Sequence, residues 1–223
     1  MGFEDRAGPS RRLAEKLAAA YAGEDGIVYA LPRGGVVPGA EVARGLRVPL
    51  DLIIAQKIRH PYKPGRTIGA VTEAGDPVID RLEAVSVPDE WLHCCITAGR
   101  QEARRRRERY AGGRAPLLAA GRLAIVVDDG IATGLTMEAA IRELQGHRPA
   151  RLVVAAAVAS ADSVRRLMNE ADDVVVLRIA EDYREAADAC YEYFPPVPDQ
   201  AVIALLREAE SALSAVETDT GGT

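Results

Sequence analysis

Short apolar runs alternate with amphipathic segments along most of this 223-residue chain. Runs rich in β-branched residues predict buried strands, and apolar residues three and four positions apart predict helices that pack one face on a sheet. The predicted strands are residues 27–31, 50–58, 123–127, 151–158 and 173–178, and the predicted helices are 13–21, 37–43, 136–146 and 161–170. Because strands and helices alternate, we expect an α/β fold with a five-stranded parallel sheet flanked by helices.

The region 59–113 departs from this alternation. It opens with the segment 59–67, whose proline, glycine and charged residues predict a mobile loop. Two short apolar runs, 68–72 and 77–79, predict a hairpin, and a long helix is predicted from Pro88 to Tyr110. We therefore expect this region to form a small hood, or lid, over the sheet.

The C-terminal part of the chain completes the expected organisation. Apolar residues at helical spacing predict a terminal helix over 201–213, and the small polar residues 217–223 predict a disordered tail. No linker divides the rest of the chain, so we expect residues 1–216 to form a single domain.

Composition and charge argue against several classes of partner. The formal net charge is −5 and the pI is near 5.4, which disfavours nucleic acid or an anionic membrane. No apolar signal region opens the chain and no apolar run reaches a membrane-spanning length, so we expect a cytoplasmic location. The three cysteines and three histidines show neither disulfide nor metal-ligand spacing.

The segment IVVDDGIATGLTM, residues 125–137, carries the most specific chemistry. It places two acids, Asp128 and Asp129, and a Gly/Thr-rich turn between a predicted strand and a predicted helix. Such a turn lets backbone amides converge on an anion, and the helix N-terminus adds unpaired N–H groups. The acids would repel a phosphate in that nest, so we expect them to face ribose hydroxyls, a divalent metal or both. The alternative is a surface turn that only caps the helix.

This segment resembles the phosphoribosyl pyrophosphate motif of the type I phosphoribosyltransferases. The resemblance covers roughly residues 25–180 and implies a five-stranded parallel core with a variable hood. It implies that Asp128 and Asp129 hold the ribose 2′- and 3′-hydroxyls, and hold Mg²⁺ mainly through those hydroxyls. It also implies that the donor is bound by the acids together with Gly130, Ile131, Ala132, Thr133, Gly134, Leu135 and Thr136.

A second motif, PRGG, ends another predicted strand. Its two glycines permit a close backbone approach, and its arginine offers a fork of donors for phosphate oxygens. In the family the loop at this place binds pyrophosphate. The resemblance therefore assigns pyrophosphate to Pro32, Arg33, Gly34, Gly35 and Lys57. The alternative for PRGG is an ordinary turn.

Lys57 lies near the end of the predicted strand 50–58, where its ammonium must reach the sheet edge or meet an anion. In related enzymes a lysine before the flexible loop contacts pyrophosphate. Lys63 and Arg66 in the loop either add charge around this leaving group or are solvated. The catalytic residues that the resemblance implies are Asp128, Asp129, Lys57 and Arg33.

Two further groups of residues have alternative interpretations. The arginine run 104–109 could contact phosphates or a neighbouring subunit, but a solvated helix end near the negative end of the helix dipole is favoured. Four aromatic residues follow the last predicted strand and could stack on a planar acceptor or pack under the terminal helix. They are Tyr183, Tyr191, Tyr193 and Phe194.

The resemblance implies transfer of ribose 5-phosphate from phosphoribosyl pyrophosphate to a nitrogenous acceptor, with release of pyrophosphate. Mg²⁺ would stabilise the charge of the leaving group, and the mobile loop would exclude water. Ala132 stands where the 6-oxopurine enzymes carry an Asp that acts at the purine ring, so we do not expect hypoxanthine or guanine transfer by that route. Glu73 on the hairpin is a candidate helper for the acceptor. A homodimer is expected, as in related proteins.

Two other functions fit parts of the same pattern. A regulatory protein that senses phosphoribosyl pyrophosphate would keep the acid pair and the nest but lack loop chemistry. Arg33, Lys57 and the charged loop favour an enzyme over such a sensor. A protein that is phosphorylated on Asp128 is disfavoured because an anion-binding nest follows this residue directly.

Overall fold

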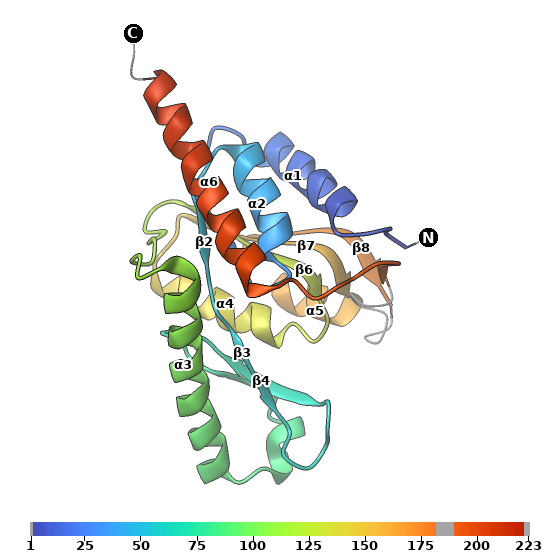
Figure 1. Cartoon of the computed structure of the whole chain (residues 1–223). Coiled ribbons are helices and arrows are strands. Elements are labelled where there is room, and N and C mark those ends of the chain that lie inside the picture. The colour runs from blue at the N-terminus through green and yellow to red at the C-terminus, as the bar shows by residue number, and fades with distance from the viewer. Residues whose placement is uncertain (1, 182–189, 221–223) are drawn as a thin grey trace.

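Five parallel strands form the central sheet, as the alternating pattern predicted (Figure 1). In spatial order they are β2 (Leu50–Leu52), β1 (Gly26–Ala30), β6 (Leu123–Ile131), β7 (Arg151–Ser160) and β8 (Asp173–Ala180). The computed structural model describes residues 2–181 and 190–220, with side chains as far as residue 214. The strands are in parallel register, so that Val28 of β1 lies opposite Leu50 on one side and Ile125 on the other.

Helices cover both faces of this sheet. One layer contains α1 (Ala7–Tyr21), α2 (Val36–Leu46) and α6 (Asp199–Thr220), and the other contains α4 (Leu135–Gly146) and α5 (Ala161–Leu167). Successive strand residues point to opposite layers. Val28 and Ala30 pack with the first layer, and Ile27 and Tyr29 pack with the second. Both faces of the sheet are therefore buried, which explains why its strands are apolar throughout.

The region predicted as a hood forms a second sheet with a long helix beside it. Its elements are β3 (Gln56–Arg59), β4 (Thr67–Val71), β5 (Val78–Ile79), the short 3-10 helix η1 (Glu83–Ser86) and α3 (Asp89–Ala111). Apolar residues of α3, such as Trp91, pack with Ile58 and Ile68 in a small core of the hood. Ala70 of the hood also packs against Leu135, so the hood rests on the start of α4.

The strand predicted over residues 50–58 is two strands in the structure. β2 ends at Leu52 in the central sheet, and β3 begins at Gln56 in the hood. Ile53 and Ile54, which lie between them, are both buried, one in each helix layer, so the apolar run continues where strand pairing stops. Lys57 therefore belongs to the hood and not to the central sheet.

Several elements are longer than predicted, among them β6 and α6. β6 continues to Ile131 because Asp128, Gly130 and Ile131 extend the ladder with β7. α6 runs to Thr220, so residues 217–220 of the predicted disordered tail 217–223 are helical. Neither α6 nor any other helix in the described residues has the length and apolar composition needed to cross a membrane.

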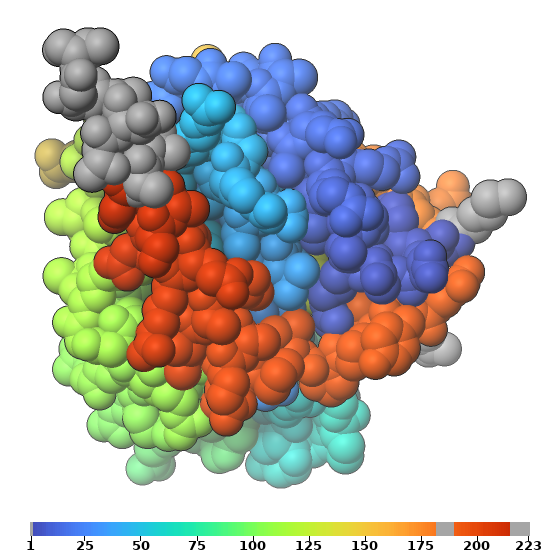
Figure 2. Space-filling view, turned by 45° about the horizontal axis from the view of Figure 1, so that its top comes forward, coloured from blue at the N-terminus to red at the C-terminus, as the bar shows by residue number. Residues whose placement is uncertain are grey.

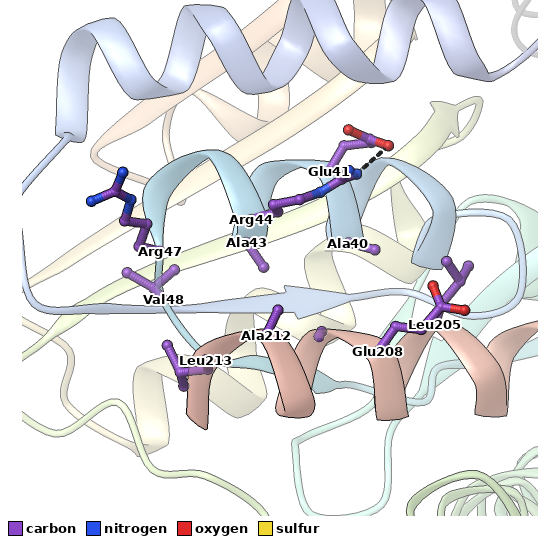
Figure 3. A pocket seen from close by; sticks show the side chains of 11 residues that line it. Ala40, Glu41, Ala43, Arg44, Arg47, Val48, Leu205, Glu208, Ala212 and Leu213 are labelled. Atoms are coloured by element: carbon purple, nitrogen blue, oxygen red, sulfur yellow. Dashed lines mark ion pairs between the residues drawn. The ribbon is translucent and has the colours of Figure 1, made fainter. Parts of the chain in front are cut away.

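A groove runs between α2 and α6 on the outside of the first helix layer (Figure 3). Ala40 and Ala43 of α2 face Ala212 of α6 across it, and Glu41 and Arg44 form an ion pair beside it. None of the residues that line this groove belongs to the motifs identified in the sequence. The residues of these motifs lie instead at the carboxyl ends of β1 and β6.

Candidate functional site

The acid pair lies at the carboxyl end of β6, which is the middle strand of the central sheet. Asp128 and Asp129 continue the strand, residues 132–134 form the turn, and α4 begins at Leu135. The structure thus has the predicted order of strand, acids, turn and helix. In an open α/β sheet this edge is where ligands bind, because loops and helix N-termini converge there.

The PRGG loop lies directly against this acid pair. It follows β1, which is hydrogen-bonded to β6, and the Leu31 amide donates to the Val127 carbonyl at 3.0 Å. A Cβ on Gly34 would lie 2.0 Å from Oδ2 of Asp129, and a Cβ on Gly35 would lie 2.7 Å from the Val127 carbonyl oxygen. Both glycines are therefore needed for the close approach that the sequence predicted. Pro32 and Arg33 precede them in the same loop, joined by a cis peptide bond.

The surroundings of Asp128 disfavour the charged form of its carboxyl group. Its Oδ1 accepts a hydrogen bond from the Asp129 amide at 2.8 Å. Burial, and after it the charge of Asp129, raise the pKa of Asp128 well above its usual range. The ammonium of Lys57 opposes this rise in the pKa of Asp128. The hood strand β3 thus brings Lys57 within electrostatic reach of Asp128.

Residues from distant parts of the chain hold Asp129. Its Oδ2 accepts a hydrogen bond from Nε of Arg6 at 2.7 Å, and these two side chains are only 12% and 11% exposed. Its backbone carbonyl accepts a hydrogen bond from the Tyr191 hydroxyl at 3.0 Å. Burial, with the charge of Asp129, raises the pKa of Tyr191, so this hydroxyl keeps its proton. Sequence reasoning missed Arg6 because a single arginine before the first helix carries no recognisable motif.

The turn after the acids is shaped by a left-handed glycine and by two side chains that bind its carbonyl groups. Gly134 adopts a left-handed conformation with φ of 79°. Oγ of Ser160 donates to the Ala132 carbonyl at 2.7 Å, and Arg166 donates to the Thr133 carbonyl. The N–H of a trans peptide points opposite to its C=O. These two hydrogen bonds therefore direct the amides of Thr133 and Gly134 away from α5. Ser160 and Arg166 are further residues that sequence reasoning missed.

The remaining predicted donor-binding residues lie in regular structure on either side of this turn. Gly130 and Ile131 are the last residues of β6, and Leu135 and Thr136 begin α4. The Leu135 amide donates to Oγ1 of Thr133 at 3.4 Å. The hydroxyl-bearing and glycine residues of the motif are therefore gathered at one strand-to-helix junction.

Arg33 extends from the PRGG loop towards α6. Its Nη1 lies 3.6 Å from Oδ1 of Asp199, the first residue of α6. Asp199 also accepts hydrogen bonds from Arg109 and Tyr110 of α3, which together with Arg33 lower the pKa of Asp199. The side chain of Arg33 is 45% exposed, so it is accessible to a ligand on the PRGG loop.

The two loop cations lie within the hood. Arg66 forms an ion pair with Glu83, and Nζ of Lys63 lies 3.8 Å from the same carboxylate. Glu73, the candidate helper for the acceptor, forms an ion pair with Arg104 of α3 at 2.9 Å. In the structure these three side chains are engaged by residues of the hood.

The prediction that the arginine run is a solvated helix end is wrong for Arg107. This side chain is 11% exposed and donates to both oxygens of Asp51 at 2.9 and 3.0 Å and to the Leu52 carbonyl at 2.6 Å. Asp51 of β2 is fully buried, so it needs a cation beside it. Arg105 and Arg109 do lie on the surface, in ion pairs with Glu102 and Asp199.

The aromatic residues near the C-terminal helix form a stack with the N-terminal segment. Tyr191 stacks on Phe194 with 4.5 Å between ring centroids, and its centroid lies 5.6 Å from that of Phe3. The guanidinium of Arg6 lies 3.6 Å from the centroid of the Phe194 ring. Tyr193 is 67% exposed. Tyr183, the other aromatic residue of this predicted group, lies outside the described residues.

The acid pair has the chemistry of a site that shares a Mg²⁺ ion with a ligand. Carboxylates and phosphate oxygens are the ligands that Mg²⁺ prefers, and it usually takes only one or two carboxylates from a protein. Asp128 and Asp129 supply two. Within residues 2–181 and 190–220, the structure places no group of three or more His, Cys, Asp or Glu residues that could enclose a metal ion by themselves.

Comparisons with known proteins agree with this arrangement. The family described as "Phosphoribosyl transferase domain" matches residues 7–194. Two strains of Mycobacterium tuberculosis have a relative, named "Putative phosphoribosyl transferase", that is 34% identical over 209 residues. The alignment covers 93% of this chain and 47% of the relative, so the chain spans about half the length of these curated relatives.

A solved structure has a similar sequence and the same fold. The crystal structure of TT1426 from Thermus thermophilus is 38% identical to this chain, with a TM-score of 0.76. The match covers 93% of this chain and 99% of the Thermus chain. The fold, the acid motif and these matches confirm the resemblance found in the sequence: the chain belongs to the type I phosphoribosyltransferase family.

Proposed function

We propose that this protein transfers ribose 5-phosphate from phosphoribosyl pyrophosphate to a nitrogenous acceptor and releases pyrophosphate. The observation that carries the proposal is the contact between Asp129 and Gly34. In this donor the pyrophosphate is attached to C1 of the ribose, next to the 2′-hydroxyl. A protein that binds both groups must therefore place the acids that bind the ribose next to the loop that binds pyrophosphate. The close approach of Gly34 to the Asp129 carboxylate supports such an arrangement.

Each part of the donor has a counterpart in the site. The carboxylates of Asp128 and Asp129 accept hydrogen bonds from the ribose hydroxyls. The nest from Gly130 to Thr136 binds the 5′-phosphate through its amides and its two threonine hydroxyls. The amides of Gly34 and Gly35 bind pyrophosphate, with Arg33 and Lys57 supplying positive charge. Because Lys57 comes from the hood, the pyrophosphate is enclosed between the two parts of the structure.

In the reaction the bond between ribose C1 and the pyrophosphate oxygen breaks, and a bond from the acceptor nitrogen to C1 forms. Positive charge develops on the ribose ring and negative charge on the departing pyrophosphate. The acids fix the ribose, and Arg33 and Lys57 stabilise the leaving group. Mg²⁺, when held by Asp128 and Asp129 mainly through the ribose hydroxyls, supplies further charge neutralisation for pyrophosphate.

The acceptor is proposed to be other than a 6-oxopurine. Ala132 has no group that can exchange a proton with a base, and its carbonyl is engaged by Ser160. An acceptor nitrogen that is nucleophilic without such assistance fits this site better. A homodimer and a cytoplasmic location are further proposals, which rest on the family resemblance.

The test is a pyrophosphate-release screen with phosphoribosyl pyrophosphate, Mg²⁺ and a panel of pyrimidines, purines, pyridine carboxylates and amines. We expect release with at least one acceptor and none without it. Donor binding without turnover on any acceptor would contradict the enzymatic proposal and favour a sensor of phosphoribosyl pyrophosphate. A protein that does not bind the donor at all would contradict both functions.

A further inference from the structure

We propose that Arg6 and Tyr191 form a clamp that positions Asp129 for the ribose. The inference rests on the proposed function, because it assigns a role in donor binding to residues outside the acid motif, the PRGG loop and Lys57. Arg6 holds the Asp129 carboxylate and Tyr191 holds its backbone carbonyl. One acid is thus fixed at both its side chain and its main chain.

The two halves of the clamp come from distant segments that are hydrogen-bonded to each other. The Phe3 amide donates to the Cys190 carbonyl at 2.7 Å, and the Glu192 amide donates to the Phe3 carbonyl at 2.8 Å. The Tyr193 amide donates to the Glu4 carbonyl at 2.8 Å. Figure 2 shows the N-terminal stretch, in dark blue, lying against the orange segment that precedes α6. These backbone hydrogen bonds fix the N-terminal segment and the segment before α6 relative to each other.

Arg6 makes three different contacts with its guanidinium group. Nε donates to Asp129, Nη1 donates to the Pro195 carbonyl at 2.7 Å, and the flat face lies over the Phe194 ring. A planar group with several fixed donors is needed to make all three contacts together, so lysine cannot replace it fully. The ion pair is shielded from solvent, which limits the freedom of the carboxylate.

The consequence for the ligand is preorganisation. Oδ2 of Asp129 accepts the hydrogen bond from Arg6 and also lies so close to Gly34 that a Cβ there would be 2.0 Å away. The carboxylate is therefore held at the boundary between the proposed ribose and pyrophosphate sites before the donor arrives. A ribose hydroxyl then meets an acceptor whose orientation is already set, which lowers the ordering cost of binding.

The test compares binding of three probes, phosphoribosyl pyrophosphate, ribose 5-phosphate and inorganic pyrophosphate, to folded variants. Arg6→Ala is expected to weaken binding of the two ribose compounds by about tenfold to a hundredfold, by analogy with the loss of a residue that orients a metal-binding side chain. Pyrophosphate affinity should stay unchanged. Arg6→Lys should restore part of the lost affinity because it keeps the charge.

Two further variants separate positioning from general damage. Tyr191→Phe keeps the ring and removes only the hydroxyl, so it should weaken binding of the ribose compounds by a smaller factor. Arg12→Ala removes an exposed arginine of α1 and should leave all three affinities at their wild-type values. Circular dichroism and thermal melts show whether each variant is folded.

Several outcomes would overturn the clamp. Tighter donor binding by Arg6→Ala would show that Arg6 competes with the donor, and unchanged binding would show that the contact has no role. An equal loss for pyrophosphate would indicate damage to the whole site. If the wild-type protein binds none of the probes, both the proposed function and the clamp are refuted. If the wild type binds the donor and Arg6→Ala gives any of the three results above, only the clamp is refuted.

Discussion

Replacing Gly34 with alanine would drive the Asp129 carboxylate out of its place. The new Cβ would lie 2.0 Å from Oδ2, 2.5 Å from Cγ and 2.8 Å from Oδ1, whereas ordinary van der Waals contact begins near 3.4 Å. To restore that contact, Oδ2 has to move by about 1.4 Å relative to the loop. The side chain cannot move this far without disturbing its hydrogen bond with Arg6.

We expect this displacement to affect ligand binding far more than folding. A misplacement of about 1 Å in a positioned group can cost about a hundredfold, so the affinity for phosphoribosyl pyrophosphate should fall by at least that factor. Overpacking of this kind typically costs about 1–3 kcal/mol, which a domain of this size can tolerate. Titration calorimetry with donor and Mg²⁺ gives the affinity, and urea unfolding gives the stability.

Gly146→Ala is the matched control because a Cβ at this last residue of α4 meets no atom within 4 Å. It should leave donor affinity unchanged and alter the unfolding free energy by no more than about 1 kcal/mol. If Gly34→Ala binds the donor as tightly as the wild type, Asp129 is not the ribose ligand in the position that the structure shows. Equal losses of affinity in both variants would show that displacement of the Asp129 carboxylate is not the cause of the loss.

Three further predictions concern the buried ion pair, the acid pair and the hood. Arg107→Met leaves the fully buried Asp51 with only the Arg114 guanidinium, 3.5 Å away, as a partner cation, so the unfolding free energy should fall in urea melts by about 3 kcal/mol, the low end for a broken buried ion pair; a loss below about 1 kcal/mol would show that the Arg107 contact does not stabilise the fold. The pKa of Asp128 is raised in the folded state, so the folded protein holds this proton more tightly than the unfolded chain does. The stability that Asp128 contributes is therefore fully present below its unfolded pKa of about 3.9 and is lost as the pH rises through the raised folded-state pKa. Asp128→Asn should therefore remove this pH dependence of stability and be more stable than the wild type at neutral pH. Thermal melts between about pH 4 and pH 8 measure this, and the same pH dependence in variant and wild type would show that Asp128 is not its source. Lys57→Ala should weaken pyrophosphate binding in calorimetry, whereas Lys63→Ala should not, because Lys63 is engaged by Glu83 in the hood; equal effects would disprove the distinction.

The parts of the site that the sequence predicted are those whose signals are local. The strand, the two acids, the Gly/Thr turn and the helix lie within residues 125–137, so neighbours in sequence determine their arrangement. The glycines of PRGG were also predictable, because only a residue without Cβ permits the close approach seen at Gly34 and Gly35. The five-stranded parallel sheet followed from the alternation of strands and helices.

The features that escaped prediction depend on contacts between distant residues. Arg6 and Asp129 are 123 positions apart, and nothing near Arg6 in the sequence marks its partner. Four consecutive arginines on a helix point in different directions, and only the tertiary structure shows that Arg107 is the one that faces the buried Asp51. The break within 50–58 was hidden because Ile53 and Ile54 are buried in helix layers after strand pairing has ended.

The proposed function depends above all on binding of the ribose of phosphoribosyl pyrophosphate by the acid pair. The most direct measurement is calorimetric titration of this donor, with Mg²⁺, into the wild-type protein and into the Asp128→Asn, Asp129→Asn double variant. We expect saturable binding to the wild type and no detectable binding to the double variant, which remains folded by circular dichroism. Undiminished affinity of the folded double variant would contradict the proposed function.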